Sequence, residues 1–306
     1  MLHFKLASFI AVVSSTVIEL NTTSQGFVIP YRVASSDQLL TIPIVTVYDG
    51  FSLLFPAGLR QLTLTTVDND RVIVEDLSAA VSNSMIASFD SPFATQIART
   101  YMIIPMHRQL VCNPANPRDF VYDGQMETVR STSERFLNVR VSVEILDSEQ
   151  DAQSQVFNSP VSTPENVYDF SIATGFPEIF VPELIIQALS DEIQRRGIVP
   201  VRISRRSFMF ASSNTISLDI PGDVTDDLID SLPTIQFCIH TDSGNRLFIR
   251  MYGRDYVGSI VSGRRQLLVR SSSTTNGRGF FGRTFVSKIA LFVDNENRTI
   301  GFGEPL

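Results

Sequence analysis

The side chains that could perform chemistry in this chain are few, and most lack the partners that a catalytic site requires. The only Asp-Ser-Gly motif is Asp242-Ser243-Gly244. A carboxylate can act as a general acid or base only with a positioned partner, and Asp-Ser-Gly is also typical of turns. His240 shares a predicted strand face with Cys238, which supplies two metal ligands where zinc needs three or four. We therefore expect no metal site and no cofactor.

The remaining reactive residue types give no further catalytic motif. Cys112 and Cys238 permit one disulfide, and the alternative is two buried free thiols. The segment 277–282 matches G-x-G-x-x-G, but the segment after it is strand-like, where the dinucleotide-binding motif needs a helix, so we interpret it as a chance match. No serine lies in the G-x-S-x-G frame of a nucleophile elbow.

The overall composition excludes other classes of function. The chain has 306 residues, with 25 Lys and Arg against 32 Asp and Glu, a net charge of −7. This balance argues against a nucleic-acid partner, because phosphates demand clustered positive charge. No stretch reaches the roughly 18 apolar residues of a membrane span, so we expect no membrane anchor.

The start of the chain has the pattern of a signal peptide over residues 1–18. Lys5 precedes the apolar run 6–13, and Val13 and Ser15 are small enough for a cleavage site. The alternative is a buried N-terminal strand. Two glycosylation acceptors, at Asn21 and Asn297, fit a secreted protein. We expect a secreted or extracellular glycoprotein.

Most of the chain predicts short strands separated by turns, which makes it an all-β protein with few short helices. Period-two patterns and turn residues predict strands at 40–47, 51–55, 61–66, 71–74, 136–145, 234–239, 246–251, 289–293 and 299–302. One clear helix is predicted over 182–196, with an apolar stripe of Leu184, Ala188, Leu189 and Ile193. A short helix is predicted over 224–231, where four aspartates favour a helix cap over a calcium site.

The order of these pieces resembles the pepsin family of aspartic proteases. The segment 292–302 (FVDNENRTIGF) looks like the closing hairpin of that family, and 232–237 (LPTIQF) looks like its Leu-Pro-x-Ile-x-Phe strand. Segment 167–175 (VYDFSIATG) is similar to its Phe-Asp-Gly-Ile-Leu-Gly-Leu-Gly segment. The resemblance implies a two-lobed pepsin-like fold, with a first lobe at 19–210 and a shortened second lobe at 211–306.

The catalytic positions are where the resemblance fails. The family presents Asp-Thr-Gly in each lobe, and two carboxylates share one proton. After 51–55 this chain has Pro56-Ala57-Gly58, with Pro56 in place of the aspartate. The 24 residues from Phe208 to Leu232 are too few for the second turn, which leaves only Asp242 as a candidate.

The resemblance also implies a flap over the binding cleft. Tyr122-Asp123-Gly124 lies where the family has a tyrosine-bearing hairpin, which would contact a bound peptide. The alternative is a plain Asp-Gly turn.

These observations favour a non-catalytic protein that binds a peptide or another protein. Two alternatives stay open. One is an active acid endopeptidase that uses unusual aspartates, with Asp49 and Asp242 as the candidates. The other is a structural component of a cell surface.

Overall fold

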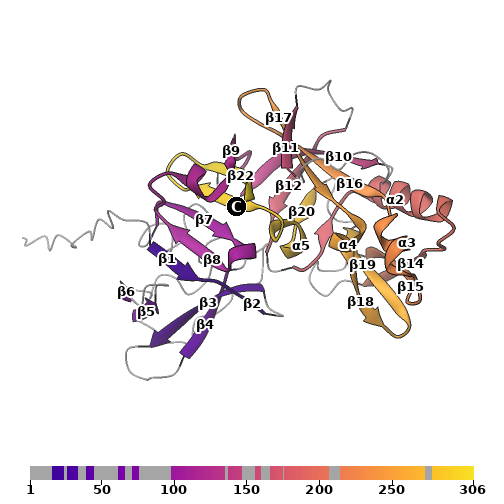
Figure 1. Cartoon of the computed structure of the whole chain (residues 1–306), viewed down its shortest axis with the longest axis horizontal. Helices are drawn as coiled ribbons and strands as arrows, with labels where there is room; N and C mark the ends of the chain where they lie inside the picture. The colour runs from indigo at the N-terminus through magenta and orange to yellow at the C-terminus, as the bar shows by residue number, and fades with distance from the viewer. Residues whose placement is uncertain are drawn as a thin grey trace, which may run out of the picture.

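The protein consists mainly of β-strands gathered into three sheets (Figure 1). A computed structural model describes residues 16–23, 26–33, 39–44, 61–65, 71–75, 98–134, 137–146, 156–159, 166–174, 176–206, 214–272 and 278–306. The helices within these ranges are few and short, which confirms the predicted all-β class. No helix among the described residues is long and apolar enough to cross a membrane.

A six-stranded antiparallel sheet joins segments that are far apart in the sequence. Its order is β1-β8-β7-β21-β22-β9, so the predicted closing hairpin is inserted between two strands from residues 100–130. The strands are β1 (Thr16–Glu19), β7 (Thr100–Ile104), β8 (Gln109–Cys112), β9 (Val121–Arg130), β21 (Ala290–Asp294) and β22 (Thr299–Pro305). Two 3-10 helices, η2 (Pro105–His107) and η3 (Pro117–Phe120), precede β8 and β9.

The eleven-stranded sheet begins at residue 138 and holds most of the remaining chain. Its order is β11-β17-β16-β10-β12-β20-β13-β19-β15-β14, with β18 paired to β19. Its strands in chain order are β10 (Asn138–Leu146), β11 (Val156–Ser159), β12 (Tyr168–Ile172), β13 (Ile179–Phe180), β14 (Val201–Arg206), β15 (Asn214–Pro221), β16 (Thr234–His240), β17 (Arg246–Met251), β18 (Val257–Val261), β19 (Arg264–Ser272) and β20 (Gly279–Phe281).

The expected boundary between lobes falls within this sheet. Strands β14 and β15 lie on either side of residue 210, and they pair in register from Val201↔Asp219 to Arg206↔Asn214. Sheet membership therefore gives no support to the limits 19–210 and 211–306, which remain a prediction.

The smallest sheet has five strands in the order β2-β3-β5-β6, with β4 paired to β3. Both β5 and β6 confirm predicted strands. Asp49 and the predicted strand at 51–55 lie outside the described residues. The strands are β2 (Asn21–Thr23), β3 (Gly26–Val33), β4 (Leu39–Ile44), β5 (Gln61–Thr65) and β6 (Arg71–Glu75).

The long helix α2 (Glu183–Arg195) confirms the predicted helix but corrects its buried face. Its buried residues are Ile186, Leu189 and Ile193, whereas Leu184 is 72 % exposed. At 100° per residue, Leu184 and Ala188 point away from the face of Ile186. The predicted stripe therefore combined two opposite faces.

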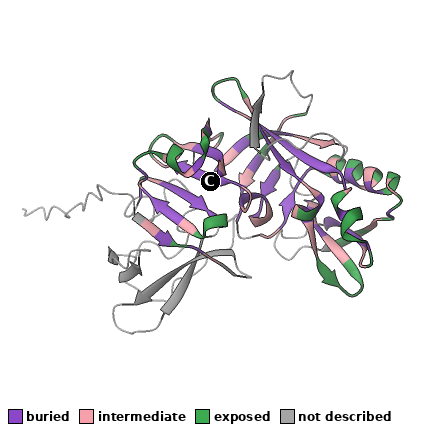
Figure 2. Cartoon of the chain, viewed as in Figure 1, coloured by how far each residue is buried: buried purple, intermediate pink, exposed green. Residues whose placement is uncertain are grey.

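The core joins both large sheets. Buried apolar side chains run continuously from β1 and β7 to β16, β19 and β22 (Figure 2). At its centre, the rings of Phe281 and Phe285 stack with centroids 3.7 Å apart, and Phe237 meets both edge-on. Three one-turn helices flank this region: α3 (Asp226–Asp230), α4 (Gly253–Tyr256) and α5 (Arg283–Val286).

Candidate functional site

The turn that follows β12 is held by backbone hydrogen bonds to a neighbouring strand. This strand pairs in parallel with β20, and both lie near the centre of the molecule beside α5 (Figure 1). The Ala173 N–H donates to the Phe281 carbonyl at 2.8 Å, and the Phe176 N–H donates to the Ala173 carbonyl at 3.1 Å. The turn is thereby held to the end of the neighbouring strand.

Two glycines allow the backbone to pack closely at this turn. A Cβ on Gly279 would lie 2.3 Å from the Phe170 ring, and one on Gly282 would lie 1.9 Å from the Glu178 carbonyl oxygen. Neither position has room for a side chain, because such contacts are far inside van der Waals distance. These glycines, part of the chance G-x-G-x-x-G match, therefore serve packing.

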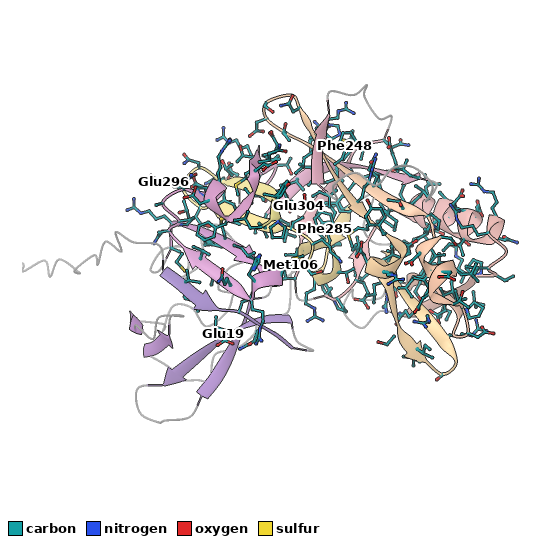
Figure 3. The ribbon with its side chains drawn as sticks, in the orientation of Figure 1. Glu19, Met106, Phe248, Phe285, Glu296 and Glu304 are labelled. Carbon is teal, nitrogen blue, oxygen red and sulfur yellow. The ribbon has the colours of Figure 1, made fainter. Side chains whose placement is uncertain are left out.

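Helix α5 holds the segment that follows the turn. The Arg283 N–H donates to the Phe176 carbonyl at 2.8 Å, and the Thr284 hydroxyl donates to the Pro177 carbonyl at 2.5 Å. Phe285, on the same helix, is labelled near the middle of Figure 3. Ala173, Phe176 and Pro177 are thus held by two elements that lie more than 100 positions later in the chain.

The surroundings of the turn are apolar and aromatic. Ala173 is buried in a cluster with Phe180 and Phe280, against which Phe176 packs. The Phe180 ring meets Phe176 and Phe280 edge-on, with centroids 5.9 and 6.1 Å away. A charged group at residue 173 would lose its hydration in this cluster.

Solved structures with a similar arrangement identify the fold. An aspartic proteinase from Irpex lacteus superposes with a TM-score of 0.57 at 10 % identity, and covers 95 % of this chain and 98 % of its own. Basic 7S globulin from soybean gives a TM-score of 0.57 at 12 % identity, with 95 % of each chain covered. The chain has the pepsin-like aspartic proteinase fold. No protein-family sequence model and no curated protein sequence matches it.

Within this fold, the turn after β12 carries a residue pattern that sequence reasoning missed. The sequence there is Ala173-Thr174-Gly175, which matches Asp-Thr-Gly except that alanine replaces the aspartate. The resemblance instead matches 167–175 to another family segment and places the second catalytic turn after Phe208. A search for a predicted strand followed directly by x-Thr-Gly would have identified this turn from the sequence.

The residues of the predicted first site, Pro56, Ala57 and Gly58, lie outside the described residues, as does Asp49.

Asp242 lies in an ordinary hairpin turn between β16 and β17. Gly244 there has φ of +79°, and the Thr241 N–H donates to the Asn245 carbonyl at 3.2 Å. Asp242 is exposed, and its Oδ2 accepts a hydrogen bond from the backbone N–H of Arg130 at 2.6 Å. The Asp242 carboxylate is therefore bonded to a backbone N–H of another strand, which gives it a structural role.

Tyr122, Asp123 and Gly124 lie on the edge strand β9 rather than at the tip of a hairpin. Val121 pairs with Pro305 and Met126 with Gly303, so four residues of β9 face one residue of β22. Asp123 and Gly124 have φ of +50° and +64°, and this left-handed turn bulges out of the strand. Tyr122 is 58 % exposed on it. Its contact with a peptide remains a prediction.

The two cysteines are free and buried, on strands of different sheets. The structure thus has the free-thiol alternative rather than the disulfide. Burial raises the pKa of Cys112 to about 12 and that of Cys238 to about 11. These thiols stay protonated at neutral pH and are poor nucleophiles.

His240 lies within hydrogen-bond distance of a serine hydroxyl. Its Nε2 lies 2.9 Å from the Ser142 hydroxyl oxygen, and the described residues contain no group of three or more metal-ligating side chains. Ser142 is 1 % exposed, so a substrate could not reach this pair.

The two predicted glycosylation acceptors differ in their surroundings. Asn297 is exposed in the turn between β21 and β22, next to Glu296 at the outer edge of Figure 3. Asn21 is half-buried on β2, where its side-chain oxygen accepts a hydrogen bond from Arg108. Modification of either residue remains a prediction.

Proposed function

We propose that this chain is a secreted, non-catalytic protein of pepsin-like fold that binds a peptide or another protein. One observation carries the proposal: the turn after β12 reads Ala173-Thr174-Gly175, with a methyl group where an aspartate would be needed. Aspartic proteolysis uses two carboxylates, one as the base for water and one as the acid for the carbonyl. A site without the carboxylate at residue 173 lacks this pair.

Two features support a binding role. Tyr122 presents an exposed aromatic ring on β9, and the side chain of Arg283, whose backbone N–H bonds to the Phe176 carbonyl next to the turn after β12, is partly exposed. Aromatic and arginine side chains are the types that contribute most to protein interfaces.

The test is proteolysis of a denatured protein substrate from acid to neutral pH, with and without a transition-state inhibitor of aspartic proteases. We expect no cleavage by protein that circular dichroism shows to be folded, and saturable binding of at least some members of a peptide panel. Inhibitor-sensitive cleavage at acid pH would contradict the proposal. Asp49→Asn and Asp242→Asn would then test the alternative dyad.

A third outcome favours the structural alternative. If the folded protein neither cleaves nor binds peptides, but associates with itself or stays on the cell surface, it is a surface component. A freely soluble monomer in the medium would count against that alternative.

Secretion is tested by expression of the full chain in a secretory host and N-terminal sequencing of the product. Because β1 spans Thr16–Glu19 and Ile18 is buried, we expect cleavage after Ser15 and a first residue of Thr16. Cleavage after Ile18 would remove a core side chain. Retention of Met1 on protein inside the cell would contradict secretion.

A further inference from the structure

The hairpin of β18 and β19 projects from the rest of the molecule at the lower right of Figure 1, and Figure 2 shows its end as exposed. The chain turns there through Ser262 and Gly263, whose φ values are +52° and +74°. Two consecutive left-handed residues form the tight two-residue turn that is typical of β-hairpins. The two strands therefore stay paired up to the end of the projection.

The end of this hairpin carries two neighbouring aliphatic side chains in solvent. Ile260 is 53 % exposed and Val261 is 65 % exposed. Among the described residues, they are the only large exposed apolar residues that are adjacent in the sequence. Successive side chains of a strand point to opposite faces, so the hairpin is uncovered on both faces at its end.

Each of these aliphatic residues has an arginine opposite it on β19. Ile260 pairs with Arg265, and Val261 pairs with Arg264. Directly opposed residues of an antiparallel pair share a face of the sheet. Each face of the hairpin therefore presents one aliphatic and one cationic side chain, and of the two arginines Arg264 is exposed while Arg265 is half-buried.

The charges of these arginines are not neutralised within the described part of the chain. Neither Arg264 nor Arg265 forms an ion pair there. By contrast, the exposed Arg202 and Arg254 each pair with a carboxylate. The sequence also has no acidic residue from 256 to 293, although the chain has a net charge of −7. The end of the hairpin is therefore a cationic projection on an acidic protein.

One acidic residue follows the segment that packs against this end. The Gly222 N–H donates to the Gly263 carbonyl at 2.9 Å. Asp223 comes next in the chain, is exposed, and forms no ion pair with either arginine. Its charge opposes an anionic ligand of the hairpin, but it is one negative charge against two positive ones.

We infer that the end of this hairpin docks on a lipid bilayer with anionic headgroups, where Ile260 and Val261 enter the interface and the two arginines bind lipid phosphates. Apolar burial and attraction to anionic lipids add together at membrane interfaces. A flat protein surface would contact one face of the hairpin, whereas lipid surrounds an inserted projection and contacts both. This inference goes beyond the proposed peptide or protein binding and does not depend on it.

Insertion can be measured with a single fluorophore, because the chain contains no tryptophan. The folded Val261→Trp variant is mixed with vesicles of phosphatidylcholine and phosphatidylglycerol in a two-to-one ratio, and with vesicles of phosphatidylcholine alone. We expect its emission to move to shorter wavelength with the anionic vesicles, because the indole leaves water. The matched control is Leu184→Trp, at an exposed apolar residue of α2, which should show no shift.

Cosedimentation with the anionic vesicles measures how strongly each variant partitions. Arg264→Gln should lower the partition coefficient about fivefold, the usual effect of one cationic side chain near an anionic membrane surface. The double substitution Ile260→Ser and Val261→Ser should lower it about tenfold, because it removes the apolar area that would be buried. Asp223→Asn should raise it. Arg118→Gln, at an exposed arginine of η3, should leave it unchanged.

Several results would overturn this inference. They are no binding to anionic vesicles, an equal loss in Arg118→Gln and Arg264→Gln, or a loss with Arg264→Gln and none with the serine substitutions, which would show anion binding without insertion. Self-association that the serine substitutions abolish, without vesicle binding, would assign the hairpin to a second copy of the chain.

The same variants keep this inference separate from the proposed function. The hairpin substitutions lie at exposed residues, so circular dichroism should show an unchanged fold and peptide binding should be unaffected. A protein that binds no peptide but inserts this hairpin into anionic vesicles would refute the proposed function and confirm the docking site.

Discussion

The carboxylate of Asp242 accepts a hydrogen bond from the backbone N–H of Arg130 at 2.6 Å. This bond joins the turn between β16 and β17 in the eleven-stranded sheet to the end of β9 in the six-stranded sheet. The one Asp-Ser-Gly motif of the chain therefore fastens two sheets together.

Asp242→Ala should lower the free energy of unfolding by about 1 kcal/mol, the usual contribution of such a hydrogen bond at an exposed site. Asp242→Asn keeps an acceptor oxygen and should cost less. Urea unfolding of both variants measures the difference. Asn245→Ala, at an exposed residue of the same turn, is the matched control. A loss of proteolytic activity in Asp242→Asn, with unchanged stability, would instead make this residue catalytic.

Restoring the missing carboxylate should not create a protease. Ala173→Asp would place a charged group among Phe176, Phe180 and Phe280, at a cost of at least about 2 kcal/mol in stability. Thermal unfolding at several pH values measures this cost, which should shrink at acid pH as the new carboxyl is protonated. Ala173→Ser is the neutral control. Inhibitor-sensitive cleavage by Ala173→Asp would show that the second catalytic aspartate is present elsewhere in the chain.

The protein should lose stability as the pH falls through the titration range of His240. Burial first, and then the charges of Arg246 and Arg140, lower the pKa of this imidazole. The folded state therefore favours neutral His240, and the unfolded state binds more protons below the ordinary pKa of about 6.5. The stabilisation that the folded state gains from neutral His240 is fully present above pH 6.5. It is lost as the pH falls toward the lower pKa that His240 has in the folded state.

The measurement is the urea midpoint as a function of pH for wild type and His240→Gln. The substitution should flatten the slope just below pH 6.5. His107→Gln is a control at an exposed imidazole, whose Nε2 lies 2.7 Å from the Leu306 carbonyl oxygen. Identical slopes for wild type and His240→Gln would contradict the prediction.

Both cysteines should resist alkylation in the folded protein. Their pKa values of about 12 and 11 leave almost no thiolate at pH 8, and both side chains are buried. Mass spectrometry after iodoacetamide treatment should show no modification of native protein and two modifications after unfolding without a reductant. A chain that gains modifications only after reduction would contain the disulfide that the structure lacks.

Local patterns predicted much of the fold. The alternation in 234–239 placed Ile235, Phe237 and Ile239 on one face, and all three are buried in β16. The closing hairpin and α2 were also predicted, because strand and helix periods are local properties. The buried face of α2 was partly wrong, since the apolar residues of that helix lie on two faces and only tertiary packing selects one.

The candidate site was harder to predict because its parts come from three distant segments. Ala173 receives its backbone partner from Phe281, and Arg270 meets Glu178 from another strand. A single sequence records none of these pairings. The bulge at Asp123 and Gly124 had a local signal, but the register between β9 and β22 decided that it is not a hairpin tip.

The place of β21 and β22 in the six-stranded sheet has a consequence for biosynthesis. These strands lie between β7 and β9, yet the ribosome produces them more than 150 residues after β9. Until then β7 and β9 have no partners on their facing edges, and their backbone groups are open to other chains. This sheet can close only after translation of residue 305, and the long sequence separation of its pairings favours slow folding.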